Sequence, residues 1–269
     1  MRNFRALLLL VSVSIGSQTY AQHSHSSDRK GIESPAPALK NIGELHHKVS
    51  TKNPQAQRYF DQGLTMLYGF NHLESERSFD YAAKLDPKLA IAHWGVALAL
   101  GSNINDPITK DREQRAAAAI RRALRLKQYA SPAERAYIDA LARRYIGRGD
   151  RAAKDRAYAN AMSVVARRYP NDPDAASLYA DSLMNLMPWD YYTADGKPKP
   201  EIRKAIVALE RVMKRWPRHP GGHHLYIHAV EASNTPERGE RSADVLGDLV
   251  PAAGHLVHMP GHIYMRVGR

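Results

Sequence analysis

The sequence of 269 residues contains no cysteine. This absence excludes disulfide bonds, thiol nucleophiles, cysteine metal ligands and attachment to a membrane through a lipid-modified N-terminal cysteine. The chain also lacks the HExxH metalloprotease motif, the GxSxG nucleophile elbow, a phosphate-binding glycine-rich loop and a dinucleotide fingerprint. Because none of these enzyme signatures is present, the sequence assigns no catalytic residue.

Long apolar runs are missing after the first 21 residues. No later run of about eighteen apolar residues occurs, so we predict no membrane span. Residues 1–21 combine a basic start (MRNFR), a short apolar run (ALLLLVSVSIG) and a small residue, Ala21, ahead of Gln22. This order is typical of a cleaved signal peptide. We therefore expect a periplasmic or secreted protein, with a Gram-negative bacterium as its source.

Acidic residues are fewer than basic ones, and the formal net charge is +12. Removal of Arg2 and Arg5 with the signal peptide leaves +12 − 2 = +10. The basic residues are spread through the middle of the chain, with acidic residues between them and no aromatic residues in register for stacking on bases. We interpret them as solvated helix faces and predict no nucleic-acid partner, with an acidic partner or an anionic cell surface as the alternative.

Residues 22–52 are rich in serine, proline and charge, which predicts a flexible leader with His46 and His47 exposed to solvent. Residues 53–269 show helical periodicity. Two stretches of this region match a 34-residue repeat pattern at Tyr59, Gly63, Ser75, Phe79, Ala82 and Pro87, and again at Ala205, Leu209, Val212 and Pro217. Gln62 departs from the pattern, because leucine is usual at its position.

These stretches resemble the tetratricopeptide repeat (TPR) family. The resemblance implies an all-α fold, a TPR-like right-handed superhelix of antiparallel helix pairs over residues 53–269, with the last repeat incomplete. It also implies that the first helices of successive repeats line a concave groove, and that a protein or peptide partner binds there.

Histidine is concentrated near the end of the chain, where residues 219–269 hold seven of the thirteen histidines. Residues three and four positions apart share one face of a helix. His224, His228 and Glu231 therefore form one stripe, and a second stripe contains His255, His258 and His262. The TPR register places both stripes on the groove, although Pro260 and Gly261 interrupt the second one.

Six such residues on two neighbouring helices predict a site for a transition metal, with zinc, iron or copper as candidates. The predicted ligands are His224, His228, Glu231, His255, His258 and His262. The alternative is a groove in which the histidines hydrogen-bond one another and a peptide.

The segments HHLYIHAVE and GHLVHMPGHIYMRVGR further resemble a poorly characterised group of exported bacterial TPR proteins. In that group the chain continues through more repeats, so we expect a C-terminally truncated member. The resulting hypothesis is an exported TPR scaffold with a partner in its groove and a metal site. The alternative is a metalloenzyme with hydrolytic or oxidative chemistry, in which Glu231 or a spare histidine acts as the base.

Two further segments are weaker candidates for lining the groove. His72 and the loop 103–105 offer polar side chains at one end of it. The aromatic loop 188–192 either forms a lid over the groove or packs against the next helix.

Overall fold

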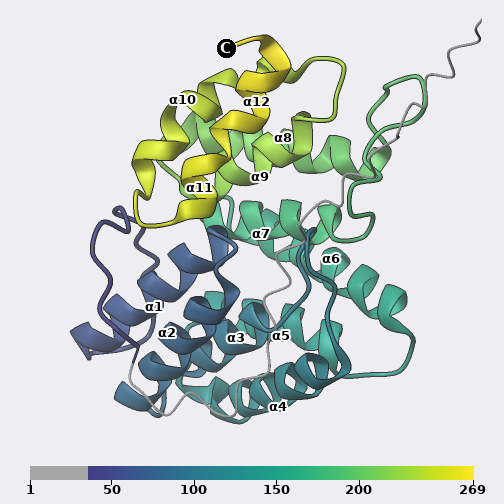
Figure 1. Ribbon diagram of the computed structural model, residues 1–269. Helices are drawn as coiled ribbons and strands as arrows, with labels where there is room; N and C mark the ends of the chain where they lie inside the picture. The colour runs from purple at the N-terminus through teal and green to yellow at the C-terminus, as the bar shows by residue number, and fades with distance from the viewer. Residues whose placement is uncertain (1–35) are drawn as a thin grey trace, which may run out of the picture.

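The computed structural model describes residues 36–269, and within this range the chain is all-helical (Figure 1). The predicted signal peptide, residues 1–21, and residues 22–35 of the predicted leader lie outside the described residues. No described helix combines the length and the apolar character needed to cross a membrane. The all-α fold of TPR-like antiparallel helix pairs predicted from the sequence is confirmed.

The helices follow one another along the chain and pack in that order. Consecutive pairs are α1 with α2, α3 with α4, α5 with α6, and α7 with α8. Their bounds are α1 Pro54–Tyr68, α2 His72–Leu85, α3 Ala90–Ala99, α4 Lys110–Leu126, α5 Pro132–Tyr145, α6 Arg151–Arg168, α7 Pro173–Met184, α8 Pro200–Arg215, α9 Pro220–Val230, α10 Glu240–Leu249, α11 Gly254–His258 and α12 Pro260–Val267. Short 3-10 helices, η1 Lys127–Tyr129 and η2 Pro236–Gly239, precede α5 and α10.

Several helices begin with a polar capping residue followed by proline. Ser131 caps α5 and forms a capping box with Glu134. Asp172 caps α7 and accepts hydrogen bonds from the backbone N–H groups of Asp174 and Ala175. His219 caps α9, where its ring accepts a hydrogen bond from the N–H of Gly222. These caps fix where the helices that carry the candidate site residues begin.

Phe79 is fully buried between the first two repeats. Its ring lies against Gly63 of α1 and Gly95 of α3, where an added Cβ would overlap the ring. Small residues at these two places let three helices approach one aromatic side chain. Residues at the repeat positions predicted from the sequence therefore make the packing contacts between the repeats.

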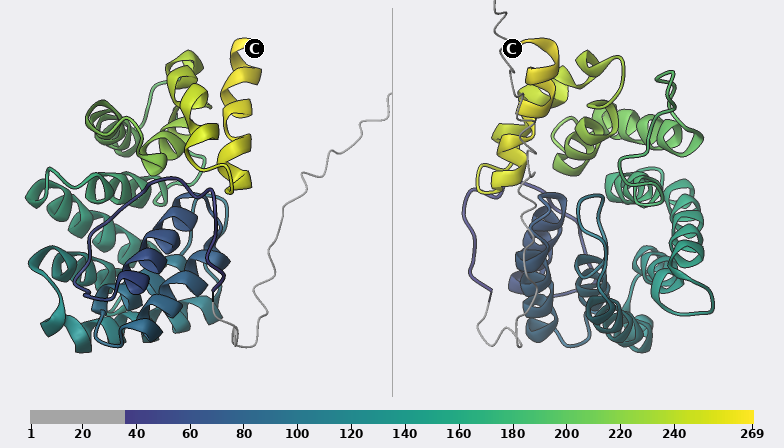
Figure 2. Two further views of the ribbon diagram at one scale, coloured as in Figure 1. Left: turned by 90° about the vertical axis from the view of Figure 1, so that its left-hand side faces the viewer. Right: turned by 45° about the vertical axis from the view of Figure 1, so that its right-hand side comes forward.

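The stack of helix pairs curves so strongly that its first and fifth repeats meet. The right-hand view of Figure 2 shows the pairs arranged in an arc, with α1 and the C-terminal helices on the same side. α1 contacts α9, where the ring of Tyr68 covers Gly221 and leaves no room for a Cβ. This closure brings Phe70, which follows α1, to the histidines of α9 and α11.

Residues 36–52 run as an extended segment hydrogen-bonded to several repeats. The backbone N–H of Leu39 donates to Gln62, and the amide of Gln62 donates to the carbonyl of Pro37 and to Ser78. Further along, Ser50 binds Glu134. The glutamine that departs from the repeat pattern is thus the anchor for the segment that precedes α1.

Candidate metal centre

The structure brings all six predicted ligands into one region at the junction of α9, α11 and α12. His224 and His228 lie on α9, with Glu231 directly after it, while His255 and His258 lie on α11. The ring centroids are 4.8 Å apart for His224 and His255, 5.3 Å for His255 and His258, and 4.8 Å for His258 and His262. Five imidazoles and one carboxylate therefore form a continuous cluster.

Three of these rings converge more closely than the others. One ligand atom from each of His224, His228 and His255 lies within 4.8 Å of the other two. The Nε2 atoms of His224 and His255 are 3.0 Å apart. Two nitrogens that bind one tetrahedral zinc ion at 2.0–2.1 Å lie roughly 3.3 Å apart. His224 and His255 therefore need only a few tenths of an ångström of movement to bind one ion, and His228 completes an inner triad whose ligand atoms lie within 4.8 Å of one another.

Glu231 determines which nitrogen of His228 is available. Its Oε1 accepts a hydrogen bond from Nδ1 of His228 at 2.7 Å, and its Oε2 accepts one from Nδ1 of His262 at 2.5 Å. The proton of a neutral His228 then resides on Nδ1, so Nε2 carries a lone pair. This Nε2 is buried and has no hydrogen-bond partner. A carboxylate behind a ligating histidine is the usual outer-shell arrangement of metal sites.

Burial keeps the rings of the inner triad neutral. It lowers the pKa of His224, with the neighbouring His228 and His255 acting in the same direction. The pKa of His255 falls to about 3 through burial and the nearby histidines. Burial also lowers the pKa of His228, although Glu231 opposes this effect. At neutral pH all three rings can act as metal ligands, which requires unprotonated imidazole.

Glu231 and His262 are shifted in opposite directions. Burial favours the protonated form of Glu231, but hydrogen bonds from His228 and His262 outweigh it and lower the pKa to about 2. The hydrogen bond to Glu231 raises the pKa of His262 against a smaller effect of burial. The cluster thus has one firmly ionised carboxylate, and its inner rings are neutral.

The second predicted stripe is interrupted where the sequence places Pro260. α11 ends at His258 and α12 begins at Pro260, so His255, His258 and His262 do not lie on one continuous helix. His258 is exposed, whereas His262 turns to Glu231. His258 belongs to neither of the two groups of ligand atoms that converge within 4.8 Å in this region.

Two aromatic residues with left-handed backbone flank His228. Phe70 has φ +51° and Trp189 has φ +64°. The Phe70 ring stacks on His228 at 5.8 Å, and the Trp189 ring meets His228 edge-on at 5.5 Å. A bulky residue rarely adopts this backbone conformation, which persists where the surroundings enforce it. The sequence offers no signal for the role of Phe70, which depends on closure of the arc.

The aromatic loop 188–192 packs against the helices that follow it, which is one of the two alternatives weighed from the sequence. Tyr191 is buried, and the hydroxyl of Tyr192 donates to the carbonyl of Ala229 on α9. Trp189 stays 48% exposed while contacting His228. The loop therefore packs against the following helices and places one indole beside the candidate metal centre.

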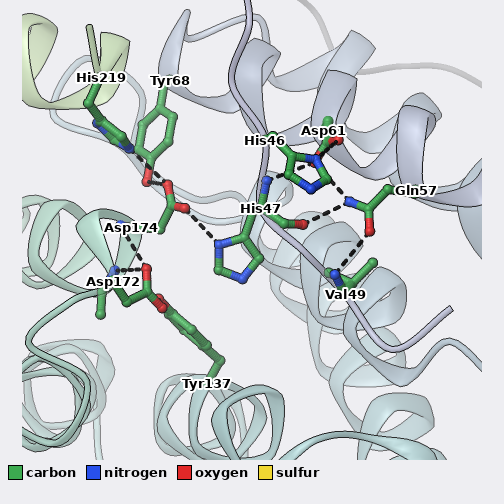
Figure 3. Close-up of polar contacts among 11 residues, drawn as sticks. His46, His47, Val49, Gln57, Asp61, Tyr68, Tyr137, Asp172, Asp174 and His219 are labelled. Carbon is green, nitrogen blue, oxygen red and sulfur yellow. Dashed lines mark hydrogen bonds and ion pairs between the residues drawn. The ribbon is translucent and has the colours of Figure 1, made fainter. Parts of the chain in front are cut away.

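A second cluster joins residues 36–52 to the repeats at Asp174 of α7 (Figure 3). Oδ1 of Asp174 accepts hydrogen bonds from the hydroxyl of Tyr68 at 2.7 Å and from Nε2 of His219 at 3.1 Å. Its Oδ2 accepts one from Nδ1 of His47 at 2.7 Å. We call Asp174, His47, His219 and Tyr68 the Asp174 cluster.

His47 was expected to be exposed, but its side chain is only 15% exposed, whereas that of His46 is 61% exposed. Burial lowers the pKa of His47, but the hydrogen bond and charge of Asp174 outweigh it and raise the pKa to about 9. Burial would raise the pKa of Asp174, and the hydrogen bonds from His219 and His47 instead hold it far below its usual range. The cluster is a buried ion pair.

His47, Asp172 and Asp174 also lie close enough to share a metal ion. However, both oxygens of Asp174 already accept hydrogen bonds, and Asp172 accepts from the hydroxyl of Tyr137 and from two N–H groups at the start of α7. Because the acceptor oxygens of Asp174 and Asp172 are satisfied within the protein, the Asp174 cluster is best explained as a structural ion pair that holds residues 36–52 against α7.

The polar candidates His72 and Asn103 lie in a pocket that shares Phe70 with the histidine cluster. Nδ1 of His72 donates to the carbonyl of Ala99, and its Nε2 is 2.8 Å from the amide of Asn103. Burial lowers the pKa of His72 to about 4. In the same pocket, burial raises the pKa of Asp181 to about 6.

Comparisons with known proteins show no family for this chain. No family model matches the chain, and no curated protein matches its sequence. One solved structure it is similar to is that of YrrB, described as a TPR protein with an unusual peptide-binding site. The two are 14% identical, with a TM-score of 0.37 over 77% of this chain and 93% of that one. At this level of similarity we draw no conclusion about ligands from the comparison.

Proposed function

We propose that this protein is an exported helical-repeat scaffold that binds a transition-metal ion through Nε2 atoms of His224, His228 and His255. The observation that carries the proposal is the convergence of three neutral imidazoles, two of them buried and one half-buried, with an unpartnered Nε2 on His228. Glu231 holds His228 in the orientation that this binding requires. Zinc, iron and copper are the candidates, because imidazole is a ligand for all three. Export is supported by the signal-peptide pattern of residues 1–21.

The alternative to metal binding is a set of histidines that only hydrogen-bond one another. The contact between Nε2 of His224 and Nε2 of His255 fits that alternative, since one ring can donate to the other. It does not provide a partner for Nε2 of His228 in the apolar surroundings of Phe70. Leaving a buried polar atom unpaired costs about 1–3 kcal/mol, and a bound ion removes that cost.

A titration tests the proposal directly. Zinc affinity is measured by competition with a chromophoric chelator for the wild type, His224→Ala and His228→Ala. Each substitution should weaken binding by more than tenfold without loss of helical circular dichroism. The matched control is His93→Ala, a histidine on α3 outside the cluster, which should bind zinc as the wild type does. Equal affinity in all four proteins would refute the proposed site.

Two further functions build on the same site. Three protein ligands leave one coordination position for water or substrate, which is the arrangement of catalytic metal sites. A metalloenzyme would lose activity on treatment with a chelator and regain it with metal, while the fold stays intact.

Binding of a protein or peptide partner is favoured by the half-exposed indole of Trp189 at the site, since aromatic residues are enriched at interfaces. Loss of partner capture in Trp189→Ala would support that second function.

A further inference from the structure

The inner triad uses only part of the histidine cluster. Glu231, His258 and His262 remain beside it, and they offer a second set of oxygen and nitrogen ligands. We propose that these three residues bind a second divalent transition-metal ion next to the first. This inference rests on the proposed function for the first ion, and we call the second position the outer site.

The two oxygens of Glu231 serve different neighbours. Oε1 accepts from His228, which belongs to the inner triad, while Oε2 faces Nδ1 of His262 at 2.5 Å. One ligand atom from each of His228, Glu231 and His262 lies within 4.8 Å of the others. Glu231 can therefore orient His228 with one oxygen and bind an ion with the other.

No lysine or arginine neutralises the Glu231 carboxylate among the described residues. Arg266 lies nearby, but its guanidinium donates to the backbone carbonyls of Glu231 and Ser233. The Glu231 side chain is only 13% exposed, and the two histidine N–H groups are its partners. A largely buried carboxylate with only imidazole partners has the chemistry of a metal ligand.

His258 supplies a third ligand from the exposed side. Its ring is 4.8 Å from that of His262, and it makes no hydrogen bond to any described residue. An exposed imidazole that makes no hydrogen bond, next to Glu231 and His262, can turn towards a shared ion without breaking one.

Binding at the outer site requires a small rearrangement of His262. A tetrahedral ion at about 2.0–2.2 Å from Nδ1 of His262 and Oε2 of Glu231 would separate those atoms to roughly 3.3–3.6 Å. The ion takes the place of the proton on Nδ1, which is released to solvent, and the remaining ring proton resides on Nε2. The metal-bound ring is neutral, and the His262 side chain is 30% exposed, so it has space to move.

The test counts ions per chain. The full chain is equilibrated with zinc, freed of unbound metal by gel filtration and assayed for zinc by elemental analysis. The wild type should hold two ions, and His262→Ala and His258→Ala should each hold one. His93→Ala, His47→Ala and the double variant His23→Ala/His25→Ala serve as controls and should still hold two. Circular dichroism checks that each variant retains its helical content.

The possible outcomes separate the outer site from the inner one. One ion per wild-type chain refutes the outer site and leaves the proposed function standing, whereas no ion refutes both. Two ions in His262→Ala, or loss of an ion in one of the control variants, also refutes the outer site. Copper-loaded protein supplies a second readout, because two adjacent Cu²⁺ ions broaden each other's EPR signal. We expect that broadening in the wild type and its absence in His262→Ala.

Discussion

Replacement of His47 by alanine should destabilise the protein in a manner that depends on pH. His47 is held in the folded state by the buried carboxylate of Asp174, and its pKa rises from 6.5 to about 9. Each unit of pKa shift corresponds to about 1.4 kcal/mol. The folded state therefore favours protonated over neutral His47 by about 3 kcal/mol, an order-of-magnitude value for a side chain that is 15% exposed.

The direction of the pH dependence follows from the sign of the shift. A pKa that is higher in the folded state stabilises folding fully below the unfolded pKa of 6.5. The stabilisation declines as pH rises from 6.5 to about 9 and is absent at higher pH. Asp174 stays ionised throughout this range, because its pKa lies far below it.

Urea unfolding of the wild type and His47→Ala, followed by circular dichroism at several pH values, measures the effect. The difference in free energy of unfolding should be larger by about 3 kcal/mol at pH 6 than at pH 9.5. His46→Ala is the matched control, since its neighbour Asp61 is partly exposed and its own ring is 61% exposed. It should give a small difference at either pH. A difference for His47→Ala that is constant across the range would refute the ion pair.

Three further predictions concern packing and the metal centre. Phe79→Ala removes a ring buried between Gly63 and Gly95 and should lower the free energy of unfolding by about 3–5 kcal/mol, as measured by urea titration. A decrease of less than about 1 kcal/mol would contradict that packing. Copper binding should quench the fluorescence of Trp189, whose ring is 5.5 Å from that of His228, and Trp189→Phe should abolish most of the quenching. Quenching that persists in this variant would place copper elsewhere. Glu231→Gln should weaken zinc binding about 10–100-fold in chelator competition, because it removes the carboxylate that orients His228, and unchanged affinity would contradict that role.

Local sequence patterns predicted the fold because the residues of those patterns make the contacts that stabilise it. Phe79 and Gly63 occupy repeat positions whose spacing along the chain reflects direct packing. The capping box at Ser131 and Glu134 acts within one helical turn. Such features depend on neighbours close in sequence, so they can be read without knowledge of the whole structure.

The candidate metal centre was only partly predictable. Helical spacing identified the residues, but it did not show that His255 joins His224 and His228 while His258 stays outside that group. The break between α11 and α12 at Pro260 also separates His262 from the two histidines of α11. The position of Phe70 follows from the curvature of the whole stack, which no local pattern encodes.

The Asp174 cluster could not be predicted from the sequence either. Its partner His47 is 127 residues away along the chain and lies in a segment with the composition of a flexible leader. Gln62 carries a signal for the docking of this segment, since it departs from the repeat pattern and hydrogen-bonds to Leu39 and Pro37. A polar residue at an apolar repeat position can therefore indicate that another part of the chain docks there.

Elemental analysis of the protein, purified without a histidine tag from its native compartment, tests the central claim most directly. Binding by His224, His228 and His255 predicts at least one transition-metal ion per chain, and its loss in the double variant His224→Ala/His228→Ala with retained helical content. Protein that contains no metal and takes up none at micromolar concentration would contradict the claim. The three converging imidazoles would then be a hydrogen-bonded lining of the repeat scaffold.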